Sequence, residues 1–142
     1  AEWDGNYQLE SVAPTIYNRW VYFALKQAMF DELGEADFKQ FLSIHLSKKT
    51  YPRLLTNDQT PWWDNRQTTE RETRAQLLAK AFEGAIVALK QQLGDDISQW
   101  NWRKVHTVEY VHPIGRQEPF DKLFNVGPYP ALGGNEVINN LG

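Results

Sequence analysis

The stretch WNWRKVHTVEYVHPIG, residues 100–115, marks the place where the chain changes from helical to extended structure. Before it, apolar residues recur every three or four positions, which is the period of a helix packed on a core. Within KVHTVEYVH, residues 104–112, the side chains follow a period of two, which is typical of a strand. We therefore expect an α+β fold: a helix-rich part at about 14–94, then a strand and loop part at about 100–142.

The two histidines of this stretch raise the question of a metal centre. His106 and His112 share one face of the expected strand, but six residues at about 3.3 Å each place them roughly 20 Å apart. The sequence contains no HExxH motif and no His, Asp and Glu cluster at ligand spacing. We therefore predict no metal site within this chain.

Two helices are expected before residue 50. The first covers about 14–33, with Ser11 and Pro14 at its start and Gly34 at its end. Apolar residues surround most of this helix, so we expect it to be covered on several sides. The spacing of Phe38, Phe41, Leu42 and Leu46 predicts a second helix with His45 on its apolar face, where a core histidine is the favoured interpretation.

The next segment, residues 51–68, is rich in Pro, Asn, Asp and Thr and predicts an ordered loop. Trp62 and Trp63 anchor this loop in our interpretation, although paired tryptophans could instead line a ligand pocket. A helix then follows, with Thr69 and Glu72 as a capping box and Gly94 as the residue after its end.

Residues 113–142 hold four of the seven prolines and five of the nine glycines, and predict a long irregular segment. FDKLF, residues 120–124, could form a turn, and NEVINN, residues 135–140, could form a short strand. A long irregular segment in a compact domain is usually functional or packs on something else. Either a binding surface lies here, or the partner of this segment lies outside the chain.

Composition excludes several classes of function. A net charge of −3 without a cluster of Lys and Arg disfavours nucleic-acid binding. The absence of Cys removes disulfides, thiol nucleophiles and Cys-bound metals. The sequence shows neither an apolar run long enough for a membrane span nor the pattern of a signal peptide, so we expect a mature or excised chain.

Three stretches together resemble the penicillin amidase family of N-terminal nucleophile (Ntn) hydrolases. WDGNYQLESVAPTIYNRW, residues 3–20, is similar to the W-D-G segment of the family, and residues 100–115 resemble its W-x-W-G-x-x-H…H-P-L-G run. LFNVGPYPALGGNEVINN, residues 123–140, resembles its F-x-x-G-P-x-P…G-G…T-V-N stretch. The order and spacing also agree. Arg103, in place of the usual Gly, and Ile138 with Asn139, in place of Val-Asn, depart from the pattern and indicate a divergent relative.

The resemblance implies that residues 1–142 are one segment from a later part of the larger (β) chain, and hold part of the Ntn-hydrolase αββα fold rather than all of it. It implies an amidohydrolase that cleaves a linear non-peptide amide, of the penicillin or N-acyl type. The nucleophile would be an N-terminal Ser activated by its own amino group. None of Ser11, Ser43, Ser47 or Ser98 has the context of that nucleophile, so we expect no catalytic residue in this chain and no activity of the segment alone.

Partners and location follow from the same resemblance. The expected partners are the small α chain, the rest of the β chain and a small-molecule amide, with no nucleic acid. The segment would hold no cofactor, any calcium in the parent enzyme would bind upstream, and the location would be periplasmic or secreted. We expect Trp100, Trp102 and His106 to be scaffold, with the histidine fixed by a hydrogen bond. Gly133, Gly134 and Asn135 are the candidates for approaching a substrate, although simple turn glycines are the more favoured interpretation.

Two other hypotheses stay open at this point. The chain could be a stand-alone binding or interaction domain that uses Trp62, Trp63 and the Gly- and Pro-rich end as a ligand surface. It could also belong to a family member that has kept the fold and lost catalysis.

Overall fold

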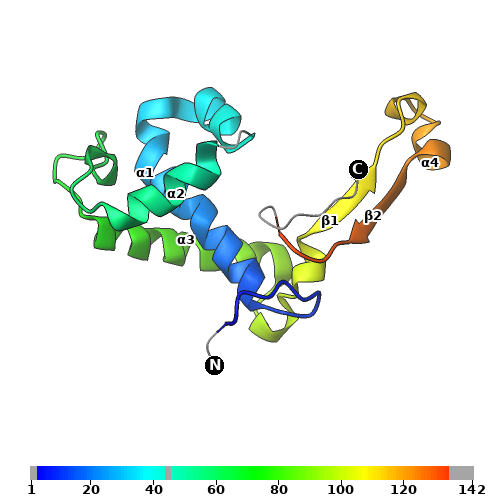
Figure 1. Cartoon of the computed structure of the whole chain (residues 1–142), viewed down its shortest axis with the longest axis horizontal. Coiled ribbons are helices and arrows are strands. Elements are labelled where there is room, and N and C mark those ends of the chain that lie inside the picture. The colour runs from blue at the N-terminus through cyan, green and yellow to red at the C-terminus, as the bar shows by residue number, and fades with distance from the viewer. Residues whose placement is uncertain (1–2, 44–45, 135–142) are drawn as a thin grey trace. The chain divides into compact units, whose positions relative to one another are not determined.

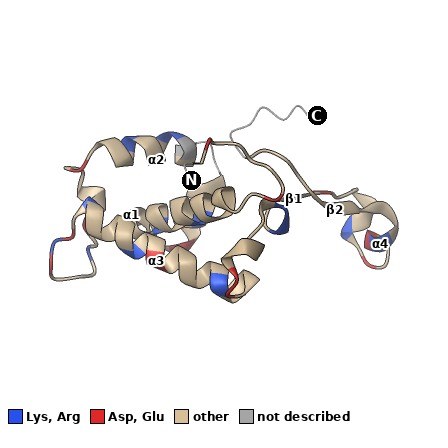
Figure 2. Ribbon diagram, turned by 90° about the horizontal axis from the view of Figure 1, so that it is seen from below, with Lys and Arg blue, Asp and Glu red and all other residues tan. Residues whose placement is uncertain are grey.

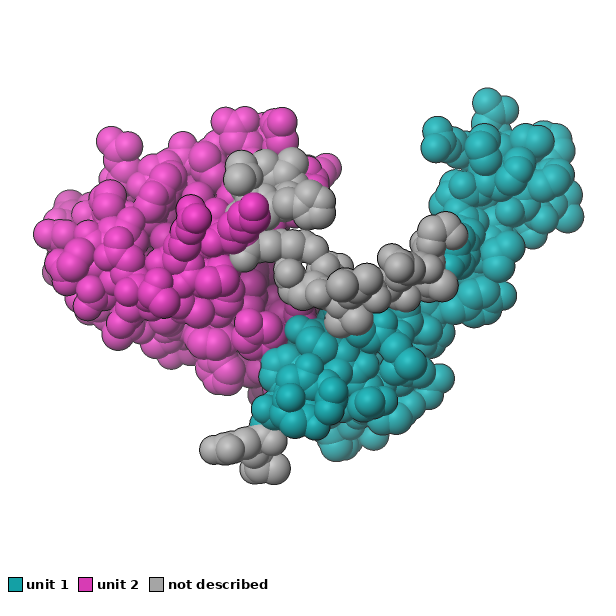
Figure 3. All heavy atoms as spheres, in the orientation of Figure 1, with its two compact units in different colours: residues 1–15, 93–142 teal, residues 16–92 magenta. Residues whose placement is uncertain are grey.

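The computed structural model describes residues 3–43 and 46–134 (Figure 1). The chain divides into two compact units, coloured separately in Figure 3. Unit 1 combines Ala1–Thr15 with Leu93–Gly142, and unit 2 is Ile16–Gln92. Helices dominate, and the described strands form one two-stranded sheet, so the predicted α+β class is confirmed.

The first helix, α1, spans Ala13–Ser43 and is interrupted at Gly34. Gly34 has a φ of 69°, in the region that favours glycine, and this residue ends the first straight section as predicted. The chain then resumes helical geometry, which agrees with the second predicted helix up to Ser43. The predicted apolar position of His45 lies outside the described residues.

The prediction of a loop over residues 51–68 is wrong for its first part. Helix α2 spans Leu46–Thr56 and contains Pro52, although a proline inside a helix removes one backbone hydrogen bond. Tyr51 and Leu54 from this helix are buried in the core, and this burial offsets the lost bond. A short 3-10 helix, Pro61–Trp63, follows, and the chain beyond it is irregular up to Thr73.

Helix α3 spans Arg74–Leu93, so it begins five positions after Thr69, the first residue of the predicted capping box of Thr69 and Glu72. The capping residues are instead Thr73 and Gln76. Gln76 accepts the Thr73 N–H through Oε1 at 2.8 Å, and the Gln76 N–H lies 3.4 Å from Thr73 Oγ1. Glu72 cannot act as predicted because its carboxylate accepts the N–H of Asn65 and the hydroxyl of Thr68. The helix ends as expected at Gly94, whose φ is 90°.

The core of unit 2 lies between α1, α2 and α3. Trp20 joins α1 to α3, since its indole Nε1 donates to the carbonyl oxygen of Leu78 at 3.1 Å. Gly84 allows close approach of the same helices, because a Cβ there would lie 2.9 Å from the ring of Phe23. The buried members of this core are Ala24, Leu25, Ala28, Met29, Phe38, Tyr51, Leu54, Trp63, Leu77 and Ala81.

Unit 1 contains the sheet. Strand β1, Thr107–Tyr110, is antiparallel to β2, Val126–Pro130, with Val108 opposite Tyr129 and Tyr110 opposite Val126. The short helix α4, Asp121–Phe124, lies at the closed end of this hairpin (Figure 1). The expected strand 104–112 is therefore shorter than predicted, because residues Trp102–Lys104 form a 3-10 helix.

The prediction that residues 113–142 are irregular is wrong for β2 and agrees with the described residues 117–120 and 131–134, which form no helix or strand. Pro128 and Pro130 disfavoured a strand, but a strand with a free edge tolerates prolines whose missing N–H groups would face away from the ladder. The turn predicted at FDKLF is present as α4. The strand predicted for NEVINN lies outside the described residues.

Candidate functional site

Three segments far apart in the sequence meet in unit 1. The backbone N–H of Trp102 donates to the Ser11 carbonyl at 2.9 Å, and that of Arg103 donates to the Leu9 carbonyl at 2.9 Å. The third segment joins through Gly133, whose N–H donates to the Tyr7 carbonyl at 3.3 Å. These are the same three stretches that carry the family resemblance, so this meeting point is the first candidate functional site.

Aromatic rings build the centre of this site. Tyr7 packs edge-on against Trp3 at a centroid distance of 5.3 Å and against Trp102 at 5.2 Å. Trp102 also stacks on His106, with centroids 4.7 Å apart and planes 17° from parallel. Trp100, two positions before Trp102 in the sequence, is completely buried, and its Nε1 donates to the Gly94 carbonyl at 2.9 Å. Such packing supports the expectation that these residues are scaffold.

His106 is held differently from the expectation. Stacking on Trp102 fixes its ring, and no hydrogen bond from its imidazole occurs among the described residues; its backbone N–H donates to the Trp102 carbonyl at 3.0 Å. Burial lowers the pKa of His106, because the charged imidazolium loses hydration there. The neutral form is therefore favoured at this position.

The proposed substrate-approach residues lie at the edge of the same cluster. Gly133 has a φ of 77° and its carbonyl accepts the indole N–H of Trp102 at 2.8 Å. Gly134 lies against Tyr7, and a Cβ there would come within 2.9 Å of the ring carbon Cε1. Both glycines thus have a conformational or packing role in the cluster, and their approach to a substrate stays a prediction. Asn135, Ile138 and Asn139 lie outside the described residues.

Arg103, the departure from the family pattern, has a partner in the first segment. Its guanidinium lies 2.6 Å from the carboxylate of Glu10, and Asn101 Nδ2 donates to the Glu10 carbonyl at 3.0 Å. Both members of the ion pair are largely exposed, so the pair contributes little stability. The contact shows how an arginine is accommodated where glycine is usual.

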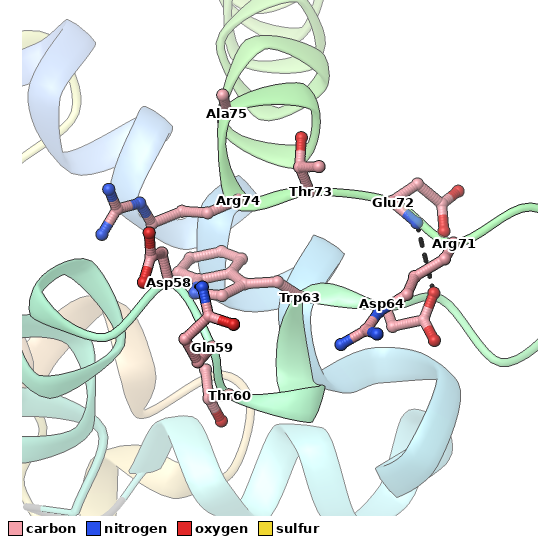
Figure 4. Close-up of a pocket in the computed structure, with 10 residues that line it drawn as sticks. All are labelled: Asp58, Gln59, Thr60, Trp63, Asp64, Arg71, Glu72, Thr73, Arg74 and Ala75. Carbon is pink, nitrogen blue, oxygen red and sulfur yellow. Dashed lines mark hydrogen bonds between the residues drawn. The ribbon is translucent and has the colours of Figure 1, made fainter.

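A second candidate site is a pocket of about 360 Å³ in unit 2, where the loop before α3 meets the end of α2 (Figure 4). Trp63 lies against it, but its side chain is buried and its Nε1 donates to the Asn57 carbonyl at 2.9 Å. Trp62 packs against the core. Trp62 and Trp63 therefore anchor the loop, as predicted from the sequence. Apart from Ala75, the remaining lining residues are polar: Asp58, Gln59, Thr60, Asp64, Arg71, Glu72, Thr73 and Arg74.

Most polar groups of this pocket are engaged in holding the loop. Asp64 Oδ1 accepts the Glu72 N–H at 3.2 Å, which is the dashed contact in Figure 4. Arg74 donates to the Leu55 carbonyl at 2.6 Å. Lys80 pairs with Glu72 at 3.4 Å. The pocket thus has a structural polar network, and the ribbon in Figure 2 shows acidic and basic positions interspersed along this unit.

An acidic pair that sequence reasoning missed lies on α1. Asp31 Oδ2 accepts the N–H of Arg66 at 2.6 Å, and this bond ties α1 to the loop before α3. Asp31 Oδ1 and Glu32 Oε2 are shielded from solvent and accept no hydrogen bond within the described part of the chain. Burial and the adjacent Asp31 carboxyl raise the pKa of Glu32 to about 7. Local sequence carries no signal for this pair, because the burial depends on a segment 35 positions away.

Two further observations concern ligands and membranes. Within residues 3–43 and 46–134, no group of three or more His, Cys, Asp or Glu side chains could hold a metal ion. In the same ranges, no helix combines the length and apolar character needed to cross a membrane.

Known proteins that resemble this chain agree on one family. The penicillin amidase family model matches residues 1–142. Acyl-homoserine lactone acylase QuiP of Pseudomonas aeruginosa is 27% identical, over 96% of this chain and 18% of that protein. Proteins of the same name from Pseudomonas fluorescens strains Pf-5 and Pf0-1 are 28% and 30% identical, over 96% of this chain and 17% and 16% of their own lengths.

The chain therefore spans less than a fifth of these relatives. No solved structure matches it significantly. The family match extends over every stretch that meets in the aromatic cluster, from the Trp3 segment to the Gly133 segment. On these grounds, the chain belongs to the penicillin amidase family.

Proposed function

We propose that this chain is a scaffold segment in the larger subunit of an amidohydrolase that cleaves N-acyl amides, with acyl-homoserine lactones as the first class to test. The observation that carries the proposal is the relationship to proteins named acyl-homoserine lactone acylase, which extends over 96% of the chain. Because the chain corresponds to less than a fifth of each relative, the reacting groups would lie elsewhere in the parent enzyme.

The chemistry would follow the pattern of the family. An N-terminal Ser hydroxyl would attack the amide carbonyl, with the α-amino group of the same Ser taking its proton as base. The C–N bond would then break, and the amine would leave with that proton. Water would hydrolyse the resulting acyl-enzyme, releasing the carboxylic acid and restoring the Ser hydroxyl. Backbone N–H groups would stabilise the oxyanion. Calcium, where the parent enzyme binds it, would have its ligands outside this segment, and no described residue is assigned to it.

The role of this chain would be to hold rigid structure beside that site. The aromatic cluster of Trp3, Tyr7, Trp102 and His106 fixes three segments through stacking and backbone hydrogen bonds. Rigid supporting elements are what precise positioning of reacting groups requires. A periplasmic or secreted location is part of the same proposal, and export of the native polypeptide would test it separately.

The test begins with the native polypeptide that carries this sequence. Its intact mass and N-terminal sequence should reveal a longer chain that begins with Ser. The purified protein should release homoserine lactone from a long-chain acyl-homoserine lactone, and replacing that Ser by Ala should abolish turnover while leaving the protein folded. The isolated 142-residue chain should hydrolyse nothing. Turnover by the isolated chain, or a Ser→Ala variant with unchanged activity, would overturn the proposal.

A phenylacetyl amide of the penicillin type serves as the comparison substrate. Hydrolysis of the phenylacetyl amide in preference to the acyl-homoserine lactone would retain the amidohydrolase reaction and reject the substrate class. Failure to hydrolyse either, in a folded and Ser-initiated protein, would point to a family member that has lost catalysis.

A further inference from the structure

We propose that the apolar side of the β1–β2 hairpin and its tip is a docking surface for another part of the parent polypeptide. We define this surface by seven side chains: Tyr110, Ile114, Phe120, Leu123, Phe124, Val126 and Tyr129. This inference rests on one part of the proposed function, namely that the parent chain is longer than 142 residues. It adds to that function the surface through which this segment contacts the rest of the parent chain.

Hydrogen bonds, and not an apolar core, hold the hairpin tip in shape. Asn125 lies at its centre: Oδ1 accepts the His112 N–H at 3.1 Å, and Nδ2 donates to the Gly115 carbonyl at 2.9 Å. The Ile114 N–H in turn donates to His112 Nδ1 at 3.2 Å. Gly115 is needed at this place, because a Cβ there would collide with the Asn125 side-chain oxygen. The tip is therefore preorganised before any partner binds.

The apolar side chains of the tip consequently remain exposed. Leu123 is 75% exposed and Ile114 is 52% exposed. Phe120 and Phe124 contact each other at a centroid distance of 6.2 Å and are still 44% and 41% exposed. An ordered loop that presents several large apolar side chains to solvent is typical of an interaction site. Preorganisation lowers the entropy cost of binding through such a loop.

The strands extend this surface along the hairpin. Val108 pairs with Tyr129 and Tyr110 pairs with Val126, with a register shift between the two pairs. Paired residues of antiparallel strands share a face of the sheet. Tyr110, Val126 and Tyr129 are each about half exposed, and every residue of β2 is exposed. A two-stranded hairpin is marginally stable by itself and normally needs further strands or a helix packed on it. Within residues 3–43 and 46–134, no further strand pairs with this hairpin.

The charges at the tip favour a protein partner over a membrane. Arg116 and Lys122 are balanced by Glu118 and Asp121 on the same short segment. Figure 2 shows both basic and acidic positions on the ribbon around α4. A surface that binds anionic lipid usually carries an excess of basic residues, and this tip has none. In each of these relatives, more than four-fifths of the protein lies outside the region that matches this chain. A parent chain of similar length would have enough further residues to form an apolar partner surface.

Hydroxyl-radical footprinting tests the proposal, since it measures the solvent access of individual side chains. The native polypeptide and the 142-residue chain would be compared at equal concentration. We expect modification of Leu123, Phe124 and Tyr129 to fall several-fold in the native polypeptide, because interface cores exclude water. Equal modification rates in both proteins would overturn the proposal, and so would a native polypeptide without further residues.

Three controls separate docking on the parent polypeptide from docking on a second copy or a membrane, and separate this proposal from the proposed enzymatic function. Protection of the 142-residue chain by self-association, seen as a doubled mass in sedimentation, would instead assign a second copy. Protection only by phosphatidylglycerol vesicles would assign a membrane. Enzymatic activity is measured separately, so an inactive native protein with a protected hairpin would reject the proposed reaction and retain the docking surface.

A matched pair of substitutions provides a second readout. Leu123→Asp should reduce the yield of folded native polypeptide, whereas Lys122→Asp, at the adjacent exposed position, should leave it unchanged. Neither should alter the unfolding midpoint of the 142-residue chain, because both side chains are exposed there. Equal yields of the two native variants would contradict docking through Leu123.

Discussion

The indole Nε1 of Trp102 lies 2.8 Å from the carbonyl oxygen of Gly133 and donates a hydrogen bond to it across 31 positions of sequence. Trp102 is 5% exposed and this bond is partly buried, so it is partly shielded from water and fixes the chain that leaves β2. The same ring also contacts Tyr7 and stacks on His106. One side chain therefore joins all three segments of the cluster.

Replacing Trp102 by Phe should weaken unit 1 specifically. The variant keeps an aromatic ring but leaves the Gly133 carbonyl without its donor, which costs about 1–3 kcal/mol for a buried group. Hydrogen exchange measured by mass spectrometry should show faster exchange in peptides covering residues 101–106 and 131–133, with little change in peptides from α3.

Trp3→Phe is the matched control for that variant. Trp3 Nε1 also donates to a backbone carbonyl, that of Asn6 at 2.9 Å, but in an exposed setting where water can replace it. We expect Trp3→Phe to change the free energy of unfolding by less than about 0.5 kcal/mol. Equal effects of the two substitutions would show that ring packing, and not the Gly133 bond, is what Trp102 contributes.

Gly134→Ala should destabilise the cluster through Tyr7. The new methyl group would lie 2.9 Å from Tyr7 Cε1, and displacing a packed ring typically costs about 1–3 kcal/mol. Removing that ring by Tyr7→Leu should relieve much of the added cost, which a double-mutant cycle on unit 1 would measure. Gly5→Ala is the control, because its φ of 84° brings strain without any neighbour within 4 Å, and Tyr7→Leu should not relieve it.

The same pair of variants tests the substrate-approach hypothesis in the parent enzyme. If Gly134 only makes room for Tyr7, Gly134→Ala in the Tyr7→Leu background should leave KM unchanged. A raised KM for acyl-homoserine lactone in that background would show that Gly134 lies against the substrate.

The raised pKa of Glu32 predicts a pH-dependent stability. The carboxyl binds its proton more tightly in the folded chain, at a pKa of about 7, than at the ordinary value of 4.5. The contribution of protonated Glu32 to the free energy of unfolding is therefore fully present below about pH 4.5 and is lost as the pH rises to about 7. Glu32→Gln should match the wild type in unfolding midpoint at pH 4.5 and exceed it at pH 8.

Urea denaturation followed by far-UV circular dichroism at both pH values would measure this difference. Glu35→Gln serves as the control, since Glu35 lies three positions further on and is exposed. A wild type whose midpoint falls no faster with pH than that of Glu32→Gln would contradict the role assigned to the pair of Asp31 and Glu32.

The corrected start of α3 gives a further test. Thr73→Ala should cost about 1 kcal/mol, because it removes the hydroxyl that interacts with Gln76 at the helix N-terminus. Thr69→Ala should change the free energy of unfolding by less than about 0.5 kcal/mol, since Thr69 is exposed and precedes the helix. The reverse order of effects would restore the capping box predicted from sequence.

The sequence predicted those elements whose signals are local. The apolar pattern and Gly34 located the first part of α1, and Gly94 located the end of α3. It placed the start of α3 too early because Thr69 and Glu72 have capping-box spacing, and only the fold shows that Asn65 and Thr68 already use the Glu72 carboxylate. Strand β2 was missed because its prolines are acceptable only at a free sheet edge, which no local pattern reports.

The candidate site was predictable as a set of stretches but not as a set of contacts. Motif resemblance singled out the segments of Trp3, Trp102 and Gly133, all of which lie in the aromatic cluster. The central position of Tyr7 was missed, because it depends on packing between segments more than 90 residues apart. The shielding of the Glu32 carboxylate oxygen depends in the same way on tertiary structure.

The division of unit 1 between the two ends of the chain bears on how the protein folds. Glu10 and Arg103, which form an ion pair, are separated by 93 positions. Joining such distant residues carries a loop-closure entropy cost that grows with the length of free chain between them. The helices of unit 2 are contiguous in sequence, and their formation would shorten that free chain. We therefore expect the rate-limiting step of folding to be the arrival of the N-terminal segment on residues 101–106, after the intervening helices have formed.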